Sequence, residues 1–270
     1  MSIKKKENMS KKSQVTVFVI ISILILVVII LLIYLQRENI TNIFVGKPPL
    51  NEIENCLLKS SEEGINILEV QGGSIDPELY YMYQGNRVEY LCYTEENYKR
   101  CVMQKPLLKQ SVERELENYM NPIIKNCIYS MKDALEKDGY TVSMKEPELD
   151  IEIIPETVLI SLELDLSIEK NNRETYKSIR TAVDSKLYEF TMITSSILNW
   201  EARYGDSETM DYMMNFPNLK VEKKTKSDGT KVYILTDRKT DEKFMFSTRS
   251  VAFPPGLVEI RNPVKNQNSK

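Results

Sequence analysis

An uncharged apolar run near the N-terminus constrains this chain more than any other feature of its sequence. Residues 15–35 read VTVFVIISILILVVIILLIYL and contain no charged residue. As a helix, the run would be about 30 Å long, which matches the hydrocarbon thickness of a bilayer. A cleaved secretory signal is the alternative, but its apolar region is usually about 7–15 residues long and ends in an A-x-A-like site, which is missing here. We therefore expect one transmembrane helix over residues 14–36.

The charges on either side of the run predict its direction. Five lysines and one glutamate precede it in the basic segment 1–13. The positive-inside rule then keeps the N-terminus in the cytoplasm and places the rest of the chain outside, as a single-pass protein of the cell membrane. Five of the 36 basic and one of the 39 acidic residues precede the run, so the remainder has a net charge of about −7. An acidic domain argues against nucleic acid as a partner, and we expect the lipid bilayer and other surface or pilus proteins instead.

All four cysteines lie beyond the apolar run, on the side where disulfides form and persist. They are Cys56, Cys92, Cys101 and Cys127. Four cysteines allow three pairings, and the sequence alone leaves all three open. We favour Cys92–Cys101, because it would close a short polar loop, which leaves Cys56–Cys127 to join two predicted helices. Zinc binding is disfavoured, since the chain has neither a C-x-x-C pair nor a histidine.

The residues at the start of the run resemble an archaeal class III signal sequence of prepilin-like proteins. The segment KKSQVTVF at residues 11–18 has basic residues before a glutamine, then a hydroxyl residue and a long apolar stretch. The resemblance implies that a prepilin peptidase cuts between Ser13 and Gln14; the alternative is an uncleaved anchor. Thr16 matches the hydroxyl position of the family pattern Q-x-S-x-E. Phe18 stands where the family pattern has its glutamate. In pilins that glutamate helps to set the register of subunits in a filament.

The rest of the chain resembles an uncharacterised family of single-pass archaeal surface proteins. QGGSI at residues 71–75, the segment around Cys127 and FSTR at residues 246–249 carry this resemblance, which implies no activity. In addition, Asn39 begins an N-x-T sequon on the predicted outer side and is a candidate glycosylation site.

After a linker over residues 37–50, the pattern of apolar residues predicts an α+β domain over residues 51–261, followed by a polar tail over residues 262–270. Helices are expected over residues 51–70, 107–137 and about 183–204, with Pro122 kinking or dividing the second. Strands are expected over residues 140–145, 149–154, 158–168, 219–224, 231–236 and 244–252, with a hairpin over 79–93. The predicted fold class is thus an N-terminal transmembrane helix followed by a disulfide-stabilised extracytoplasmic α+β domain of antiparallel strands and about three helices.

Three groups of residues invite a functional reading. Gly72-Gly73 could bind phosphate, but the lysine or G-x-G spacing of phosphate loops is missing, so we expect a turn. The tyrosines of the predicted hairpin could form a binding face, although half-buried strands also favour tyrosine. They are Tyr80, Tyr81, Tyr83, Tyr90 and Tyr93. Four acids of the central strands could serve as paired carboxylates in a hydrolase or bind calcium, but alternating acids are typical of a solvated strand face. They are Asp150, Glu152, Glu163 and Asp165.

Missing residue types exclude several classes of enzyme. Without histidine, neither a His-based catalytic triad nor a His-based metal site can form. The Walker, Rossmann and nucleophile-elbow patterns are also missing. We therefore expect no catalytic, metal or cofactor-binding residues, and predict a membrane-anchored extracytoplasmic surface protein with a non-enzymatic structural or interaction role, for example pilin-like. The alternatives are a surface hydrolase that uses paired carboxylates and an accessory subunit of a membrane complex.

Overall fold

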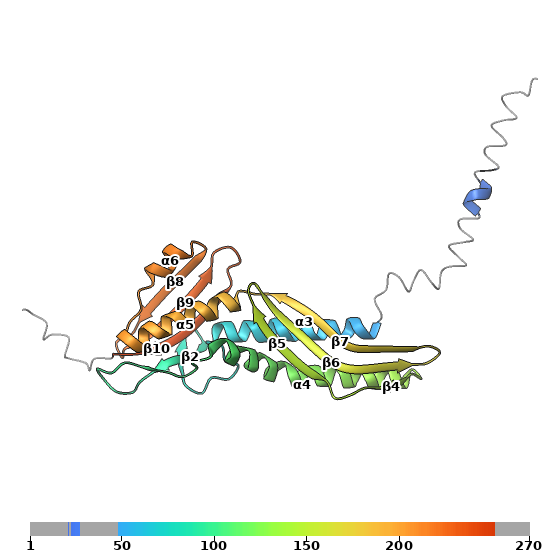
Figure 1. Cartoon of the computed structure of the whole chain (residues 1–270), viewed down its shortest axis with the longest axis horizontal. Helices are drawn as coiled ribbons and strands as arrows, with labels where there is room; N and C mark the ends of the chain where they lie inside the picture. Colours follow the sequence, from blue (N-terminus) through green and yellow to red (C-terminus); the bar gives the residue numbers. More distant parts are fainter. Residues whose placement is uncertain (1–20, 22, 28–47, 252–270) are drawn as a thin grey trace, which may run out of the picture. The chain divides into compact units, whose positions relative to one another are not determined.

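The computed structural model describes residues 21, 23–27 and 48–251 of the chain (Figure 1). The chain divides into two compact units, residues 1–51 and 52–270, and both sheets lie in the second. The predicted segments 1–13 and 262–270, most of the predicted span 14–36 and of the linker 37–50, and Ser13, Gln14 and Asn39 lie outside the described residues.

The predicted fold class is wrong in its transmembrane helix. Within the described residues, no helix combines the length and the apolar character needed to cross a membrane. The two longest helices, α3 (Pro48–Val70) and α4 (Leu108–Lys137), have the length, but charged residues recur along both of them. These helices are amphipathic because each buries one face against the domain and exposes the other to water. The described part of the chain is therefore an α+β structure with two sheets.

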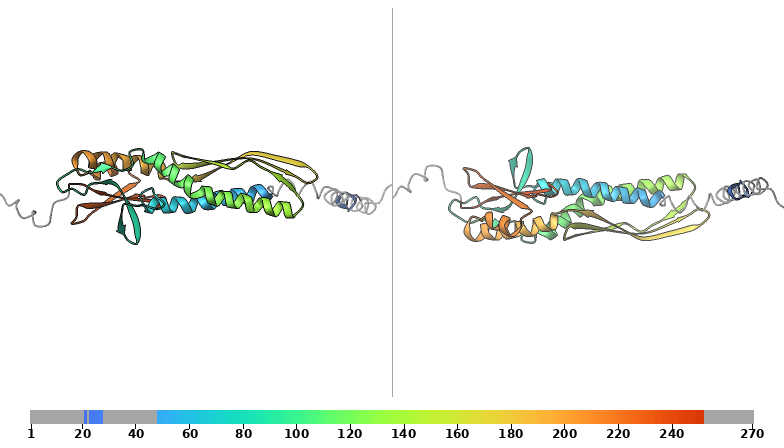
Figure 2. Two further views of the ribbon diagram at one scale, coloured as in Figure 1. Left: turned by 90° about the horizontal axis from the view of Figure 1, so that it is seen from below. Right: turned by 90° about the horizontal axis from the view of Figure 1, so that it is seen from above.

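Helices α3 and α4 form an antiparallel pair, visible in blue and green in Figure 2. Gly64 marks a close approach, because a Cβ atom there would lie 2.5 Å from the Leu116 side chain. A disulfide joins Cys56 of α3 to Cys127 of α4, with Cα atoms 6.7 Å apart. Helix α3 begins at Pro48 rather than at Asn51, since proline suits the first helical position. Helix α4 runs through Pro122 and is not divided there.

The second disulfide joins Cys92 to Cys101, with Cα atoms 5.3 Å apart. The two bonds are the pairs that the spacing of the cysteines favoured. Disulfides persist in oxidising compartments, so the pair of bonds indicates an extracytoplasmic protein.

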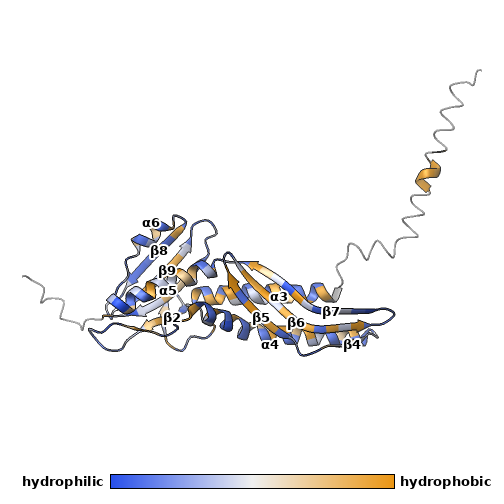
Figure 3. Cartoon of the chain, in the orientation of Figure 1, coloured by the Kyte–Doolittle hydropathy of each residue, from blue (hydrophilic) through white to orange (hydrophobic). Residues whose placement is uncertain are grey.

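A long antiparallel sheet packs on this helix pair. Its strands are β4 (Thr141–Ser143), β5 (Glu148–Ile154), β6 (Thr157–Glu169) and β7 (Arg173–Asp184). Strand β6 pairs with all three others and buries alternate aliphatic residues, the apolar pattern seen along β5 and β6 in Figure 3. Strand β7 was not predicted: only Ile179 is buried in this edge strand, so apolar residues do not alternate along it.

The other sheet has the strand order β1-β2-β10-β9-β8, with β3 paired to β2. Its strands are β1 (Tyr80–Tyr83), β2 (Asn86–Tyr93), β3 (Val102–Met103), β8 (Leu219–Thr225), β9 (Thr230–Asp237) and β10 (Lys243–Arg249). The expectation of antiparallel strands fails at one place, because β10 runs parallel to β2, with Ser247 beside Tyr90. Parallel neighbours need a long connection, and here the helices and the other sheet lie between them in the sequence.

Helix α5 (Leu187–Tyr204) covers one face of this sheet, where its Phe190 stacks on Phe244 with ring centroids 6.3 Å apart. The helix begins later than predicted, because residues 183–184 end strand β7. A short helix, α6 (Met210–Asn215), follows and was not predicted. On the opposite face, Tyr81 and Tyr83 pack against a small aliphatic cluster around Val88, so these two tyrosines cover the sheet rather than form a free binding face.

Candidate functional site

A groove between helices α5 and α6, hereafter the α5–α6 groove, is the candidate functional site. It encloses about 550 Å³. Its lining residues are Ser196, Trp200, Glu208, Asp211, Tyr212, Asn215 and Phe216. A hollow of this size is in the range of ligand sites, and its lining combines aromatic rings with a few polar groups.

Large apolar side chains are unusually exposed in and beside the α5–α6 groove. Trp200 and Phe216 in its lining are each 50% exposed, and Tyr204, whose ring centroid lies 5.0 Å from that of Trp200, is 65% exposed. Three methionines of the two helices are at least half exposed as well: Met192, Met210 and Met214. Large apolar side chains exposed in such number on two neighbouring helices are typical of an interaction site, and methionine adapts its shape to different partners.

The four-residue spacing of α5 creates this surface. Met192, Ser196, Trp200 and Tyr204 recur every fourth residue and therefore lie along one side of the helix. The side that faces the sheet is filled by other residues, among them Phe190, which is 1% exposed. A hydrogen bond of 2.8 Å between the hydroxyl groups of Ser196 and Tyr212, which both line the groove, joins α5 to α6.

A buried charged cluster holds the C-terminal end of α5 on the sheet. Glu201 of α5 is fully buried, and Lys231 of β9 donates to both of its carboxylate oxygens at 3.0 Å. Lys231 also donates to the carbonyl oxygen of Gly205 at 2.5 Å, and the Tyr233 hydroxyl donates to Glu201. Burial raises the pKa of Glu201, while Lys231 and Tyr233 oppose that shift. Because these groups bind one another, the cluster positions Trp200 and Tyr204 and offers no free reactive group.

The rim of the α5–α6 groove is acidic. Glu208 and Asp211 are the charged residues that line it, and neither lysine nor arginine lines it within the described chain. Glu208 also accepts a hydrogen bond of 3.1 Å from the backbone N–H of Met210, which fixes its carboxylate at the start of α6. The groove therefore suits a ligand with an apolar body and positive charge.

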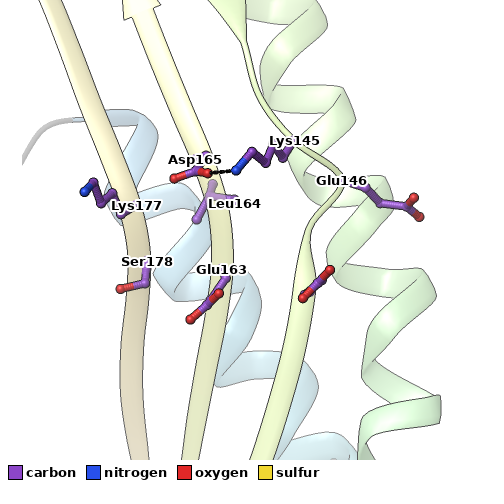
Figure 4. A pocket seen from close by; sticks show the side chains of 8 residues that line it. Lys145, Glu146, Glu163, Leu164, Asp165, Lys177 and Ser178 are labelled. Atoms are coloured by element: carbon purple, nitrogen blue, oxygen red, sulfur yellow. Dashed lines mark ion pairs between the residues drawn. The ribbon is translucent and has the colours of Figure 1, made fainter.

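A second hollow, hereafter the acidic hollow, lies on the outer face of the long sheet (Figure 4) and encloses about 400 Å³. Glu163 and Asp165, two of the four predicted carboxylates, line it, whereas Asp150 and Glu152 do not. Strand β6 has an irregular register between Glu163 and Leu166, and Lys145 reaches across to Asp165 at 2.5 Å.

Asp165 of the acidic hollow is not suited to act as the proton donor of a hydrolase. Such an enzyme needs one carboxyl group whose pKa is raised, so that it can donate a proton near neutral pH. Here the hydrogen bond and the charge of Lys145 lower the pKa of Asp165. Glu148 lies directly opposite Glu163 in the strand register. It was not among the four acids that the sequence analysis selected as candidates. Among the residues that the structure describes, no group of three or more acids or cysteines could hold a metal ion.

The Gly72-Gly73 turn has a structural role. Both glycines have positive φ angles, 76° and 81°, which side-chain-bearing residues rarely adopt. A Cβ atom on Gly73 would lie 2.6 Å from a Val112 methyl group, so the turn packs directly on α4. The backbone N–H of Glu89 donates to the carbonyl oxygen of Gln71 at 3.3 Å, which ties the turn to β2.

The α5–α6 groove was missed in the sequence, where Trp200 is simply part of the helix predicted over about residues 183–204. One signal could have revealed it. Apolar residues at four-residue spacing occur on α5 in addition to those of its buried side, and the segment after Gly205 is rich in methionine and aromatic residues. A helix with two apolar sides packs one side on the core of its domain and favours a packing partner for the other.

No family model matches the chain, and no curated protein or solved structure matches it. What the chain does is therefore inferred from its own residues.

Proposed function

We propose that the chain is an extracytoplasmic surface protein with a non-enzymatic interaction role, and that its α5–α6 groove binds an apolar polypeptide segment that carries basic residues. One observation supports this proposal above the others. Six large apolar side chains, each at least half exposed, gather on α5, α6 and the residue after α6, around a groove whose charged lining residues are both acidic. Burying them against a partner would contribute favourable free energy, at about 25 cal/mol per Å² of apolar surface.

The charge of the rim favours a basic partner. Each exposed ion pair would contribute little to affinity, but a negative rim speeds the encounter with a positive segment and disfavours an acidic one. Other surface or pilus proteins are the class of partner that the extracytoplasmic location allows. The hydrolase alternative is less well supported, because Lys145 holds the Asp165 carboxylate in its charged form.

A pilin-like form of this role depends on cleavage between Ser13 and Gln14, which lie outside the described residues. That cleavage stays a prediction. N-terminal sequencing of the protein isolated from its cells decides it: a mature chain that begins at Gln14 would support a pilin-like subunit, and one that begins at Met1 or Ser2 would oppose it.

Fluorescence of Trp200 tests the proposed binding site, because it is the only tryptophan in the chain. The probes are two synthetic peptides with the same apolar centre, one flanked by lysines and the other by glutamates. We expect the lysine-flanked peptide to shift the Trp200 emission to shorter wavelength in a saturable manner and the glutamate-flanked peptide to have little effect.

Variants of the two hollows supply the controls. The double variant Glu208→Gln/Asp211→Asn should bind the lysine-flanked peptide about three- to tenfold more weakly at low salt, because two exposed ion pairs are lost. The matched variant Glu163→Gln/Asp165→Asn in the acidic hollow should bind it normally. Equal binding of both peptides, or equal effects of the two double variants, would rule out the α5–α6 groove as a site for basic segments.

A further inference from the structure

The chain reaches its last described residue, Val251, at the C-terminal end of α5. The backbone N–H of Val251 donates to the carbonyl oxygen of Lys99 at 2.8 Å. The Ser250 hydroxyl donates to the carbonyl oxygen of Glu201 at 3.3 Å, near the end of α5. Val251 also packs so closely on Gly205, the residue that caps α5, that Gly205 has no room for a side chain. These contacts fix the position of Val251, to which residues 252–270 are attached, at the C-terminal end of α5.

The next residues of the chain have the composition that the groove calls for. Residues 252–261 read AFPPGLVEIR and include Phe253, the pair Pro254-Pro255 and three further branched apolar residues. The segment has one acid, Glu259, and one basic residue, Arg261, and two lysines follow it at positions 265 and 270. The segment is therefore neutral and mainly apolar, which suits the aromatic lining of the groove rather than its acidic rim.

Geometry allows the segment to reach the groove from its own domain. Val251 contacts the residue directly after Tyr204, and the Tyr204 ring lies 5.0 Å from that of Trp200, which lines the groove. An extended chain advances at most about 3.3–3.6 Å per residue, so a few residues suffice to bring Pro254-Pro255 to these rings. Paired prolines favour the polyproline II conformation, which docks between aromatic side chains with little loss of entropy.

We propose that residues 252–261 occupy the α5–α6 groove of their own chain and compete there with the partner segment. The regulatory effect rests on the proposed function, because a segment that occupies the groove limits access only if the groove is the partner site. A basic apolar ligand would bind only to the fraction of molecules whose groove is vacant, so its apparent affinity falls in proportion to that fraction. The C-terminal segment thus acts as an intramolecular competitor that a stronger partner displaces.

Two variants of the full chain test the competition. The first ends at Val251, and the second carries Phe253→Asp and Leu257→Asp at full length, which keeps the chain length and all contacts of residues 249–251. In the unaltered protein, Trp200 should emit at shorter wavelength and be better protected from acrylamide quenching than in either variant. Both variants should bind the lysine-flanked peptide about tenfold more tightly than the unaltered chain, if the segment fills nine grooves in ten.

A synthetic peptide of residues 252–270 completes the test. Added to the chain that ends at Val251, it should restore the short-wavelength emission, whereas a peptide of the same composition in scrambled order should not. The emission of the full chain should not depend on its concentration. A shift that disappears on dilution would show that a second copy supplies the segment, and would overturn the intramolecular arrangement.

The outcomes separate this inference from the proposed function. If the chain that ends at Val251 binds the lysine-flanked peptide no more tightly than the full chain does, and its Trp200 emission is unchanged, the groove binds partners but its own C-terminal segment is not the competitor. If Trp200 responds to removal of the segment and to its peptide but to no lysine-flanked peptide, the segment occupies the groove and the proposed partner site is wrong.

Discussion

The two hollows of this domain are similar in size but differ in the interactions of their side chains: those of one are paired with one another, and those of the other are left exposed to water. In the acidic hollow, Lys145 pairs with Asp165 on a sheet face that is already suited to water. In the α5–α6 groove, Trp200 and Phe216 stay half exposed next to two carboxylates. Covering a charged surface that already has internal ion pairs contributes little to binding, whereas burying exposed aromatic rings against a partner is favourable. The comparison shows that the more acidic hollow is the less promising site.

The two regions differ beneath the surface as well. Under the acidic hollow, strand β6 presents only aliphatic side chains to the helix pair. The buried charged residues of the described chain all lie in or beside the other sheet: Glu69, Glu89, Glu201 and Lys231. Loss of one partner of a buried charge is strongly destabilising. A single substitution in the buried charged cluster should therefore disturb the groove, whereas the acidic hollow rests on no buried charge.

The largest expected effect concerns that cluster. Glu201→Ala should lower the free energy of unfolding by about 3–5 kcal/mol, because the buried Lys231 ammonium then keeps only the exposed Asp206 carboxylate as a charged partner. Lys145→Ala, which breaks the exposed pair of the acidic hollow, should lower the free energy of unfolding far less, because water and salt screen that pair. Urea unfolding of both variants measures the difference. Similar losses for the two would remove the contrast between the regions.

A loss of stability with rising pH is expected from Glu69, at the end of α3. Burial, and to a smaller extent the nearby charge of Glu242, raise the pKa of Glu69 to about 8 from its usual value of 4.5. The folded chain therefore keeps this proton between pH 4.5 and 8 while the unfolded chain loses it, so stability falls as pH rises through that window. The slope should reach about 1.4 kcal/mol per pH unit at most.

Glu69→Gln isolates this contribution, because glutamine fills similar space and does not titrate. The difference between the unfolding free energies of the two proteins should be small below pH 4.5 and should grow in favour of the variant up to about pH 8. A difference that is constant over the range would show that Glu69 does not keep its proton in the folded chain.

Binding should depend on the aromatic rings more than on any residue of the acidic hollow. The double variant Trp200→Ala/Phe216→Ala should weaken binding of a dye-labelled, lysine-flanked peptide by at least about tenfold, because aromatic anchors dominate the energy of such interfaces. Fluorescence anisotropy of the dye measures this without tryptophan. Tyr129→Ala, which removes an aromatic side chain of α4 that is 45% exposed, is the matched control and should bind normally.

The smallest effect is expected in the acidic hollow. Asp165→Asn should change the free energy of unfolding only slightly, and the change should shrink further at high salt, where exposed pairs are screened. Asp165 has a positive φ of 40°, a conformation that asparagine also tolerates, so the substitution leaves the backbone unstrained. A larger loss would mean that the Lys145–Asp165 pair supports the sheet as strongly as the buried cluster supports α5.

Local patterns predicted most elements of the domain. The predicted helix over residues 107–137 corresponds to α4, and the alternation of Val158, Ile160 and Leu162 located β6 to within a residue or two. Strand β7 escaped prediction because an edge strand needs few buried residues, and α6 because six residues are too short for a helical period to show. The transmembrane helix of the predicted fold class is not found among the helices of the described residues.

The sequence by itself determined the elements whose side chains alternate between core and water, the favoured pairing of the cysteines and the lack of histidine chemistry. Only the tertiary structure decided that β2 and β10 run side by side in parallel, that Tyr81 and Tyr83 cover a sheet, and that Trp200 faces a groove. The physical reason is that a residue's neighbours along the chain set its local conformation, whereas its burial depends on segments far away in the sequence. The spacing of apolar residues predicts the helix on which Trp200 lies. The exposure of Trp200 depends on the sheet, which buries the other side of α5.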